Sequence, residues 1–440
     1  FVNGIPFIVI ENKRPTASLA KARSQLLRYQ SEDCIPHLFH FAQLLLTTNR
    51  QDALYATVGT PQKFWQAWRE EEDDKFAADP LARQTIAPAD LETLGEMFVP
   101  IPDAPAVELA ELVNRRLVSA DEQAVYSREF TVARSYFDAL AAEGGRVVTS
   151  QDRTLYALCR PERLLKLVRG FTVFEGGIRK IARPPQFFAI GKAMDRVLQA
   201  DAKGVRKGGV IWHTQGSGKS LTMVMLARAL ALDKGIANPR ILIVTDRDDL
   251  DRQIKGTFKS CELEPVRATS GAHLVELIRR RTPLVTTIIN KFDTALRAKA
   301  EPDDDPNIFV LVDESHRSQA GRLGGHGQFA GKMRRLLPRA CYLGFTGTPL
   351  LKREKSTLAA FGGLIHKYAI DEAVADGAVV PLLYEGRIVE QQVTGPGLDR
   401  WFEKLSAGLR DAQRADLKRK FSTANALSKT GQAIRAKAWD

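Results

Sequence analysis

The chain has few of the residues that build disulfide frameworks or zinc sites. Its four cysteines, Cys34, Cys159, Cys261 and Cys341, show no Cys-x-x-Cys spacing, and its 7 histidines are not clustered. This argues against a zinc ribbon or a disulfide-rich scaffold and fits a reducing cytosol. The sequence also lacks an apolar run of transmembrane length and a signal peptide. We therefore expect a cytoplasmic protein without a membrane role.

Neither an internal repeat nor a long low-complexity segment interrupts the chain. Its 440 residues, 44% of them hydrophobic, are enough for two to three domains with cores of their own. The net charge of +12 favours a polyanionic partner, because lysines and arginines on one face bind phosphates without reading sequence. A uniformly solvated basic surface is the alternative interpretation of the charge.

The most informative segment follows a short apolar strand at residues 209–211. Its glycines let successive backbone N–H groups turn inward on a triphosphate, Lys219 reaches the outer phosphates, and the Ser220 hydroxyl ligates magnesium. A helix expected at 221–232 adds its N-terminal dipole. The residues expected to form this nucleotide cradle are Thr214, Gln215, Gly216, Ser217, Gly218, Lys219 and Ser220.

The strict eight-residue pattern opens with glycine, and His213 stands in that place. We expect little consequence, because this position only starts the loop. A glycine-bearing turn that binds nothing is the structural alternative, and the strand and helix on either side weigh against it.

A second acidic site follows the continuous apolar strand at residues 308–312. An aspartate at the carboxyl end of such a strand, here Asp313, can hold magnesium beside the phosphates, and Glu314 can polarise the attacking water. Alone, this segment is equally well explained as a solvated acidic turn. Its pairing with the lysine loop favours the catalytic interpretation.

Further strand signals at residues 241–244, 284–289 and 341–345 alternate with helix-period stretches such as 272–281. This alternation predicts an α/β fold, a doubly wound parallel sheet whose ligand lies at the carboxyl ends of the strands.

These segments together resemble superfamily 2 DNA helicases and translocases, specifically the motor-bearing R subunit of type I restriction enzymes. The resemblance rests on residues 213–220, 313–319 and 345–349, and on the segment 244–253. It implies a RecA-like motor domain, ATP as the nucleotide, Mg²⁺ held by Ser220 and Asp313, and Glu314 as the catalytic residue. The resemblance implies additional ATP-binding residues, Arg183, Gln186, Asp313 and His316, and coupling residues, Thr346, Gly347 and Thr348. Arg183 and Gln186 stand where the family reads the adenine base, although Gln186 is equally explicable as a surface amide.

A different chemistry is indicated near the amino terminus, where residues 7–10 are expected to form a strand leading into Glu11 and Lys13. Two positions apart on a strand, these side chains point to the same face. The carboxylate can then hold a metal ion while the ammonium stabilises the attacking water or the phosphorane charge. By itself, such a pair on an edge strand is more often a solvated face.

Gln25 and Tyr29 lie four apart on an expected helix and share one of its faces. With the residues flanking the Glu-x-Lys strand, they resemble the PD-(D/E)xK nuclease of the same R subunits and its Gln-x-x-x-Tyr motif. The resemblance implies catalytic roles for Glu11, Lys13, Gln25 and Tyr29, with Glu11 as a metal ligand. Packing of Tyr29 at a core edge is the alternative.

The resembled nuclease also uses an aspartate on an earlier strand, and no Asp or Glu occurs in residues 1–10. The resembled motor has a second RecA-like domain that supplies arginines to the ATP site. We expect both elements to lie outside this chain, and the chain alone to bind ATP with almost no turnover and no DNA cleavage.

The expected organisation has four parts. Residues 1–70 form the C-terminal part of a PD-(D/E)xK nuclease domain, 71–180 a helical connecting region, 181–385 the first RecA-like motor domain, and 386–440 the start of a second motor domain or a helical extension. The resemblance implies double-stranded DNA and the methyltransferase and specificity subunits of a type I complex as partners.

Three functions remain open at this point. The chain belongs to a translocating restriction subunit that cuts duplex DNA, to a helicase or remodelling motor whose Glu11 strand is vestigial, or to a module that senses ATP and grips DNA without hydrolysis.

Overall fold

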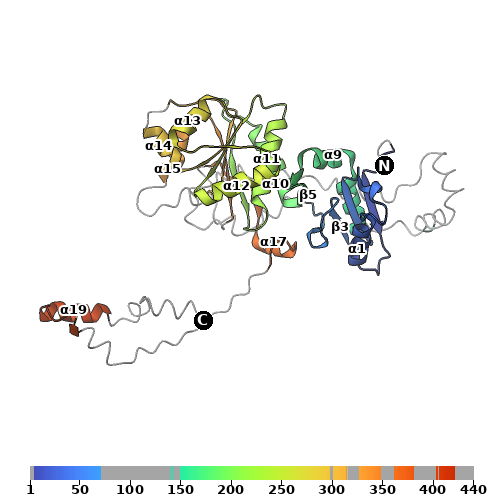
Figure 1. Ribbon diagram of the computed structural model, residues 1–440, viewed down its shortest axis with the longest axis horizontal. Helices are drawn as coiled ribbons and strands as arrows, with labels where there is room; N and C mark the ends of the chain where they lie inside the picture. Colours follow the sequence, from blue (N-terminus) through green and yellow to red (C-terminus); the bar gives the residue numbers. More distant parts are fainter. Residues whose placement is uncertain are drawn as a thin grey trace. The chain divides into compact units, whose positions relative to one another are not determined.

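The computed structural model describes residues 4–70, 139, 142, 149–297, 301–313, 315, 327–347, 361–380, 403–404 and 406–421 (Figure 1). The chain divides into two compact units, residues 1–380 and 381–440. In the second unit the longest described element is helix α19 (Asp411–Phe421). The chemistry predicted from the sequence falls in the first unit.

A small mixed sheet opens the first unit. Its strands are β1 (Ile8–Asn12), β2 (Leu44–Thr48) and β3 (Ala53–Ala56), with β1 parallel and β3 antiparallel to β2. Helix α1 (Leu19–Tyr29) covers one face, after an N-cap at which the Ser18 side chain accepts a hydrogen bond from the Ala20 N–H. The 3₁₀ turns η1 (Pro36–Phe39) and η2 (Gln62–Phe64) complete this part of the chain.

The two faces of this sheet pack into different cores. Leu45 and Ala56 lie with Leu26 of α1 in a small cluster, whereas Leu46 and Tyr55 on the opposite face join the largest core of the molecule. Because side chains alternate along a strand, a single strand register places Leu45 and Ala56 in one core and Leu46 and Tyr55 in the other.

Two helices and a hairpin precede the second sheet: α8 (Ser150–Cys159), α9 (Pro161–Gly170), β4 (Thr172–Glu175) and β5 (Ile178–Ile181). The hairpin turns at Gly176 and Gly177, whose φ angles of 58° and 78° suit a tight turn between twisted strands. Sequence periodicity predicted the helical character of this region and missed the hairpin, since strands of four residues are too short for a period to emerge.

The second sheet has seven strands, all parallel, in the order β12-β6-β11-β10-β7-β9-β8. The strand bounds are β6 (Gly209–His213), β7 (Arg240–Thr245), β8 (Val266–Arg267), β9 (Leu284–Ile288), β10 (Ile308–Val312), β11 (Cys341–Thr346) and β12 (Leu364–Tyr368). The five strands expected from the sequence are all present, and β8 and β12 are additional. This confirms the predicted α/β fold with a parallel sheet.

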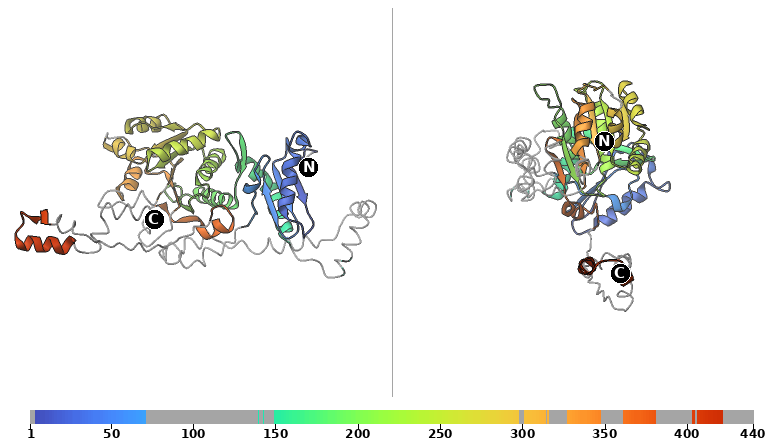
Figure 2. Two further views of the ribbon diagram at one scale, coloured as in Figure 1. Left: turned by 60° about the horizontal axis from the view of Figure 1, so that its bottom comes forward. Right: turned by 90° about the vertical axis from the view of Figure 1, so that its left-hand side faces the viewer.

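Helices cover both faces of the sheet, as Figures 1 and 2 show. The helix bounds are α10 (Pro184–Val197), α11 (Lys219–Leu232), α12 (Asp248–Ser260), α13 (Gly271–Arg279), α14 (Asn290–Arg297), α15 (Gly327–Leu336) and α17 (Ile370–Ala375). Successive residues of one strand enter opposite cores: Ile211 packs with α10, α11 and α12, and Val210 packs with α13, α14 and α15. Fully buried strands therefore show continuous apolar runs instead of alternation.

Candidate nucleotide site and nuclease strand

The predicted phosphate loop lies at the carboxyl end of β6, between the edge strand β12 and β11. Gly216 and Gly218 adopt positive φ angles of 83° and 93°, which side chains with a Cβ adopt at a cost. The Ser217 hydroxyl donates to the Thr214 carbonyl at 2.6 Å and closes the loop on itself. Helix α11 then begins at Lys219, two residues earlier than predicted, so the lysine and Ser220 stand in its first turn. N–H groups of a first helical turn have no partner within the helix and suit an anion.

The third predicted motif lies against this loop. A Cβ on Gly347, directly after β11, would stand 2.8 Å from the Lys219 Nζ and 3.2 Å from the Gln215 backbone nitrogen. A side chain at this position would therefore displace the ammonium and press on the loop backbone. Strand order explains the contact, because β11 is hydrogen-bonded to β6 and its carboxyl end lies at the same sheet edge.

The acidic segment is attached to the same edge through backbone hydrogen bonds. The Asp313 N–H donates to the Val244 carbonyl at 2.9 Å, and the Ser315 N–H donates to the Phe345 carbonyl at 2.9 Å. A Cβ on Gly344 would stand 2.9 Å from the Ser315 hydroxyl oxygen. The structure thus places Asp313 and Thr346 at the loop's end of the sheet; Glu314, His316 and Thr348 lie outside the described residues.

Gln186 connects α10 to the phosphate loop. Its amide nitrogen donates to the Gly218 carbonyl at 3.1 Å and approaches the Thr222 hydroxyl at 3.3 Å, while its amide oxygen accepts from the Arg183 N–H at 2.9 Å. The side chain is only 4% exposed. These bonds fix the loop's last peptide relative to Arg183, which is a structural role that a surface amide would not have.

His213 was expected only to start the loop, and in the structure it has a further contact. His213 is 1% exposed at the end of β6, and its Nε2 lies 2.8 Å from the Nδ1 of His366 on β12. Burial, followed by the neighbouring His366 and Lys219, holds the pKa of His213 well below its usual range. The imidazole is therefore neutral, and it joins the start of the phosphate loop to an edge strand. Sequence periodicity offered no signal for His366, which stands beside Lys367 in a short strand.

The nuclease-like residues gather on one face of the first sheet. Glu11 is in register with Thr47, and Lys13 donates a hydrogen bond to the Glu11 carboxylate. Register puts Glu11 and Thr47 on the face that α1 covers, and Gln25 is a residue of that helix. Tyr29 packs at the edge of the cluster beneath α1.

Two oxygens on this face test whether a metal ion fits. The Oε1 of Gln25 and the Oγ1 of Thr47 are buried, and neither has a hydrogen-bond partner among the described residues. A carboxylate, an amide oxygen and a hydroxyl are hard oxygen ligands of the kind that Mg²⁺ prefers. The donor set therefore fits a magnesium site that includes Glu11, although the described part of the chain holds no cluster of three His, Cys, Asp or Glu.

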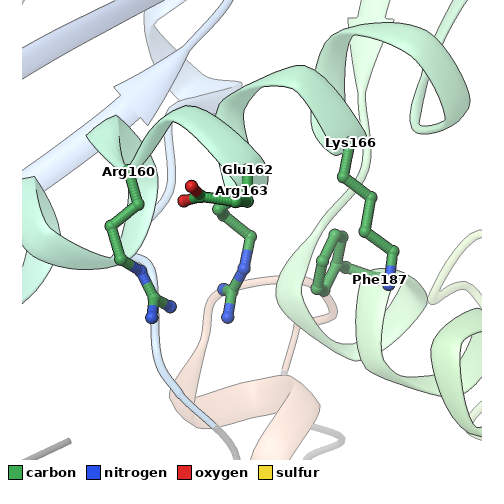
Figure 3. Close-up of a pocket in the computed structure, with 5 residues that line it drawn as sticks. All are labelled: Arg160, Glu162, Arg163, Lys166 and Phe187. Carbon is green, nitrogen blue, oxygen red and sulfur yellow. The ribbon is translucent and has the colours of Figure 1, made fainter.

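A cationic pocket of about 320 Å³ lies between α9 and α10, lined by Arg160, Glu162, Arg163, Lys166 and Phe187 (Figure 3). The Arg163 guanidinium pairs with Glu70 at 2.9 Å and lies over the rings of Trp68 and Phe187. Arg163 thus links the segment after η2 to the first turn of α10.

Buried contacts also join β3 and the segment after η2 to the chain at and just before the start of α10. The Tyr55 hydroxyl donates to the Ala182 carbonyl at 2.9 Å, and Trp68 packs edge-on against Phe187 with ring centroids 5.4 Å apart. Burial raises the pKa of Tyr55, so the hydroxyl keeps the proton that it donates. The two sheets therefore share a core instead of being joined by a loose linker.

A parallel sheet with helices on both faces, a glycine-bordered lysine loop at the end of β6, and acidic and Thr-Gly segments at the same edge define a RecA-like domain. Residues 185–415 match the family described as SWI2/SNF2 ATPase, and residues 1–64 match the N terminus of type I restriction enzyme R proteins. The first match covers more than half of the chain. The chain belongs to the SWI2/SNF2 ATPase family, and its resemblance to type I R subunits is confirmed.

Curated relatives extend the likeness along most of the chain. It is 30% identical over 418 residues to the MjaIXP endonuclease subunit of a type I restriction enzyme from Methanocaldococcus jannaschii, covering 92% of this chain and 34% of that protein. It is 31% identical over 408 residues to the HindI endonuclease subunit from Haemophilus influenzae, covering 88% of this chain and 32% of that protein. The chain thus spans about a third of the length of these relatives.

Among solved structures, the Hef helicase domain of Pyrococcus furiosus is similar with a TM-score of 0.35 and 17% identity, over 58% of this chain and 53% of that chain.

In the described part of the present chain, no helix has the length and apolar character needed to cross a membrane.

Proposed function

We propose that the chain is the nuclease-linked first motor domain of a type I restriction R subunit, which moves duplex DNA by ATP hydrolysis and cuts it. The observation that carries the proposal is the junction of two chemistries in one core. A phosphate loop with its Thr-Gly neighbour stands on one sheet, and a Glu-x-Lys strand with α1 stands on the other.

In the motor, Lys219 and the N–H groups at the start of α11 bind the phosphates of ATP. Ser220 and Asp313 would hold Mg²⁺, which neutralises charge on the transferring phosphoryl group when bound. Glu314 polarises the attacking water. Gly347 lies against Lys219. The end of β11 would therefore move when the γ-phosphate is bound or released, and this movement couples hydrolysis to motion of the domain.

In the nuclease, Glu11 would hold a Mg²⁺ ion, which supplies an activated water and stabilises the charge on the cleaved phosphate when bound. Lys13 stabilises the same developing charge. Gln25 and Thr47 contribute buried oxygens on that face, and Tyr29 packs α1 against the sheet.

The implied partners are duplex DNA and the methyltransferase and specificity subunits of a type I complex. The net charge of +12 supports DNA binding through phosphates, which weakens as salt concentration rises. Sequence recognition would then reside in the specificity subunit.

The alternative is a remodelling or helicase motor with a vestigial Glu11 strand. The two are separated in the full-length protein assembled with its partner subunits, by measuring DNA cleavage and DNA-stimulated ATPase together. We expect Glu11→Ala and Lys13→Ala to abolish cleavage and spare the ATPase. DNA-stimulated ATPase without cleavage by the parent would leave the motor alone as the function. Cleavage at the parent rate by both variants would show that the Glu11 strand is not the nuclease site, and loss of both activities would mean that the strand is structural.

A further inference from the structure

We infer that Gln66, which lies in the segment following the nuclease-like sheet, is a positioning residue for Arg183 and so sets how tightly the motor holds the adenosine part of ATP. The inference rests on the proposed nucleotide function, in which Arg183 stands at the adenine.

The backbone of Gln66 is fixed to the first sheet. Its carbonyl accepts from the Tyr55 N–H at 2.7 Å, and its own N–H donates to the Tyr55 carbonyl at 3.1 Å, which makes an antiparallel bridge to β3. Gln66 therefore moves with that sheet and not with the motor's loops.

The side chain of Gln66 reaches the arginine. With its amide oxygen turned toward the guanidinium, it accepts from Arg183 Nε at 2.6 Å and from Nη2 at 3.2 Å. A single amide oxygen thus accepts hydrogen bonds from both N–H groups along one edge of the guanidinium. Hydrogen bonds from a charged donor are stronger than neutral ones, and two to one acceptor restrict the rotation of the arginine side chain.

The backbone of Arg183 is held from both sides. Tyr55 binds the Ala182 carbonyl directly before it, and the Arg183 N–H donates to Gln186, whose amide nitrogen donates to Gly218 in the phosphate loop. A continuous set of hydrogen bonds therefore runs from β3 through Gln66 and Arg183 to the loop that cradles phosphate.

This arrangement has a selective consequence. Without the Gln66 oxygen, Arg183 must be ordered when ATP binds, and ordering a long side chain at that moment weakens binding. We expect the affinity for ATP to fall roughly five- to tenfold, because ordering one long side chain on binding costs an entropy that corresponds to this change in affinity. The phosphate loop is unchanged, so binding of a polyphosphate without a base should be unaffected.

The test is calorimetry on the 440-residue chain with two probes, magnesium-ATP and magnesium-tripolyphosphate. Gln66→Ala and Gln66→Met, which keeps the length but offers no acceptor, should weaken ATP and leave tripolyphosphate unchanged. Gln66→Glu retains an acceptor and should bind ATP like the parent. Gln62→Ala is the matched control, since Gln62 bonds to Ala20 and Ser24 on the far side of the same segment.

Each outcome decides a point. Equal weakening of both probes, or parent-like ATP binding by Gln66→Met, overturns the positioning role. Arg183→Ala separates this from the proposed function: if that variant binds ATP like the parent, Arg183 does not contact the nucleotide. If Arg183→Ala weakens ATP selectively while both Gln66 variants bind normally, only the positioning role is wrong.

Discussion

Gly347→Ala should impair ATP binding without unfolding the protein. The added Cβ would meet the Lys219 Nζ at 2.8 Å and the Gln215 backbone nitrogen at 3.2 Å. The first atom ends a flexible side chain and moves at little cost, whereas the second is backbone and must shift by a few tenths of an ångström. Gly347 is not one of the glycines with a positive φ angle, so alanine can adopt its backbone conformation without strain. The damage therefore falls on the position of the ammonium and of the loop.

The magnitude follows from what Lys219 contributes. A hydrogen bond to a charged group is worth about 1.5–3 kcal/mol, so loss of one such bond from the ammonium would weaken ATP binding roughly tenfold to a hundredfold. The melting temperature should change little, since the displaced groups lie at the sheet edge outside the two cores. Calorimetric titration with magnesium-ATP and thermal unfolding of the same preparation measure the two effects.

Gly256→Ala is the matched control, because nothing lies within 4 Å of the added Cβ and the residue stands inside α12. It should bind ATP like the parent and gain about 0.5–1 kcal/mol in stability, since alanine favours a helix interior over glycine. Parent-like ATP affinity in Gly347→Ala would refute the close approach of the Thr-Gly segment to the lysine.

Three further outcomes are expected. Lys219→Ala should abolish magnesium-ATP binding in calorimetry with an unchanged melting temperature, and unchanged affinity would remove the phosphate-loop assignment. In the full-length protein, Glu314→Gln should bind ATP and lose turnover, whereas Asp313→Ala should weaken the magnesium dependence of binding; hydrolysis at the parent rate by Glu314→Gln would contradict the water-polarising role. Because burial lowers the pKa of His213 in the folded protein, the unfolded chain takes up that proton first, so stability should fall as pH drops below about 6.5. His213→Asn should flatten this part of a melting-temperature profile, and an equally steep profile would show that other groups cause it.

Much of the motor was predictable because its signals are local. The five expected strands are short apolar runs, and a run of β-branched residues bounded by turn residues indicates a buried strand. The loop at residues 214–220 is recognisable because phosphate binding demands glycine, lysine and a hydroxyl at fixed positions. Neither signal depends on the rest of the chain.

Strands β8 and β12 were missed for different reasons. Strand β8 has two residues, too few for any pattern. Strand β12 contains His366, which in the sequence alone resembles an exposed polar residue. In the structure its Nδ1 lies 2.8 Å from the Nε2 of His213. A buried polar pair is a property of two segments 153 residues apart, so no window of sequence contains it.

The nuclease face required the fold as well. Glu11 and Lys13 are visible in sequence, and their alternation predicts a common face, but the sequence does not say which of the sheet's faces is covered by α1. The register pairs Glu11 with Thr47 and Val9 with Leu45, and Leu45 packs beneath α1. A slip of one residue would turn Glu11 away from α1, to the face that Leu46 and Tyr55 share with the large core. The packing of Leu46 and Tyr55 in the large core therefore favours the register that places Glu11 and Thr47 on the face covered by α1, so the nuclease strand depends on the second sheet beside it.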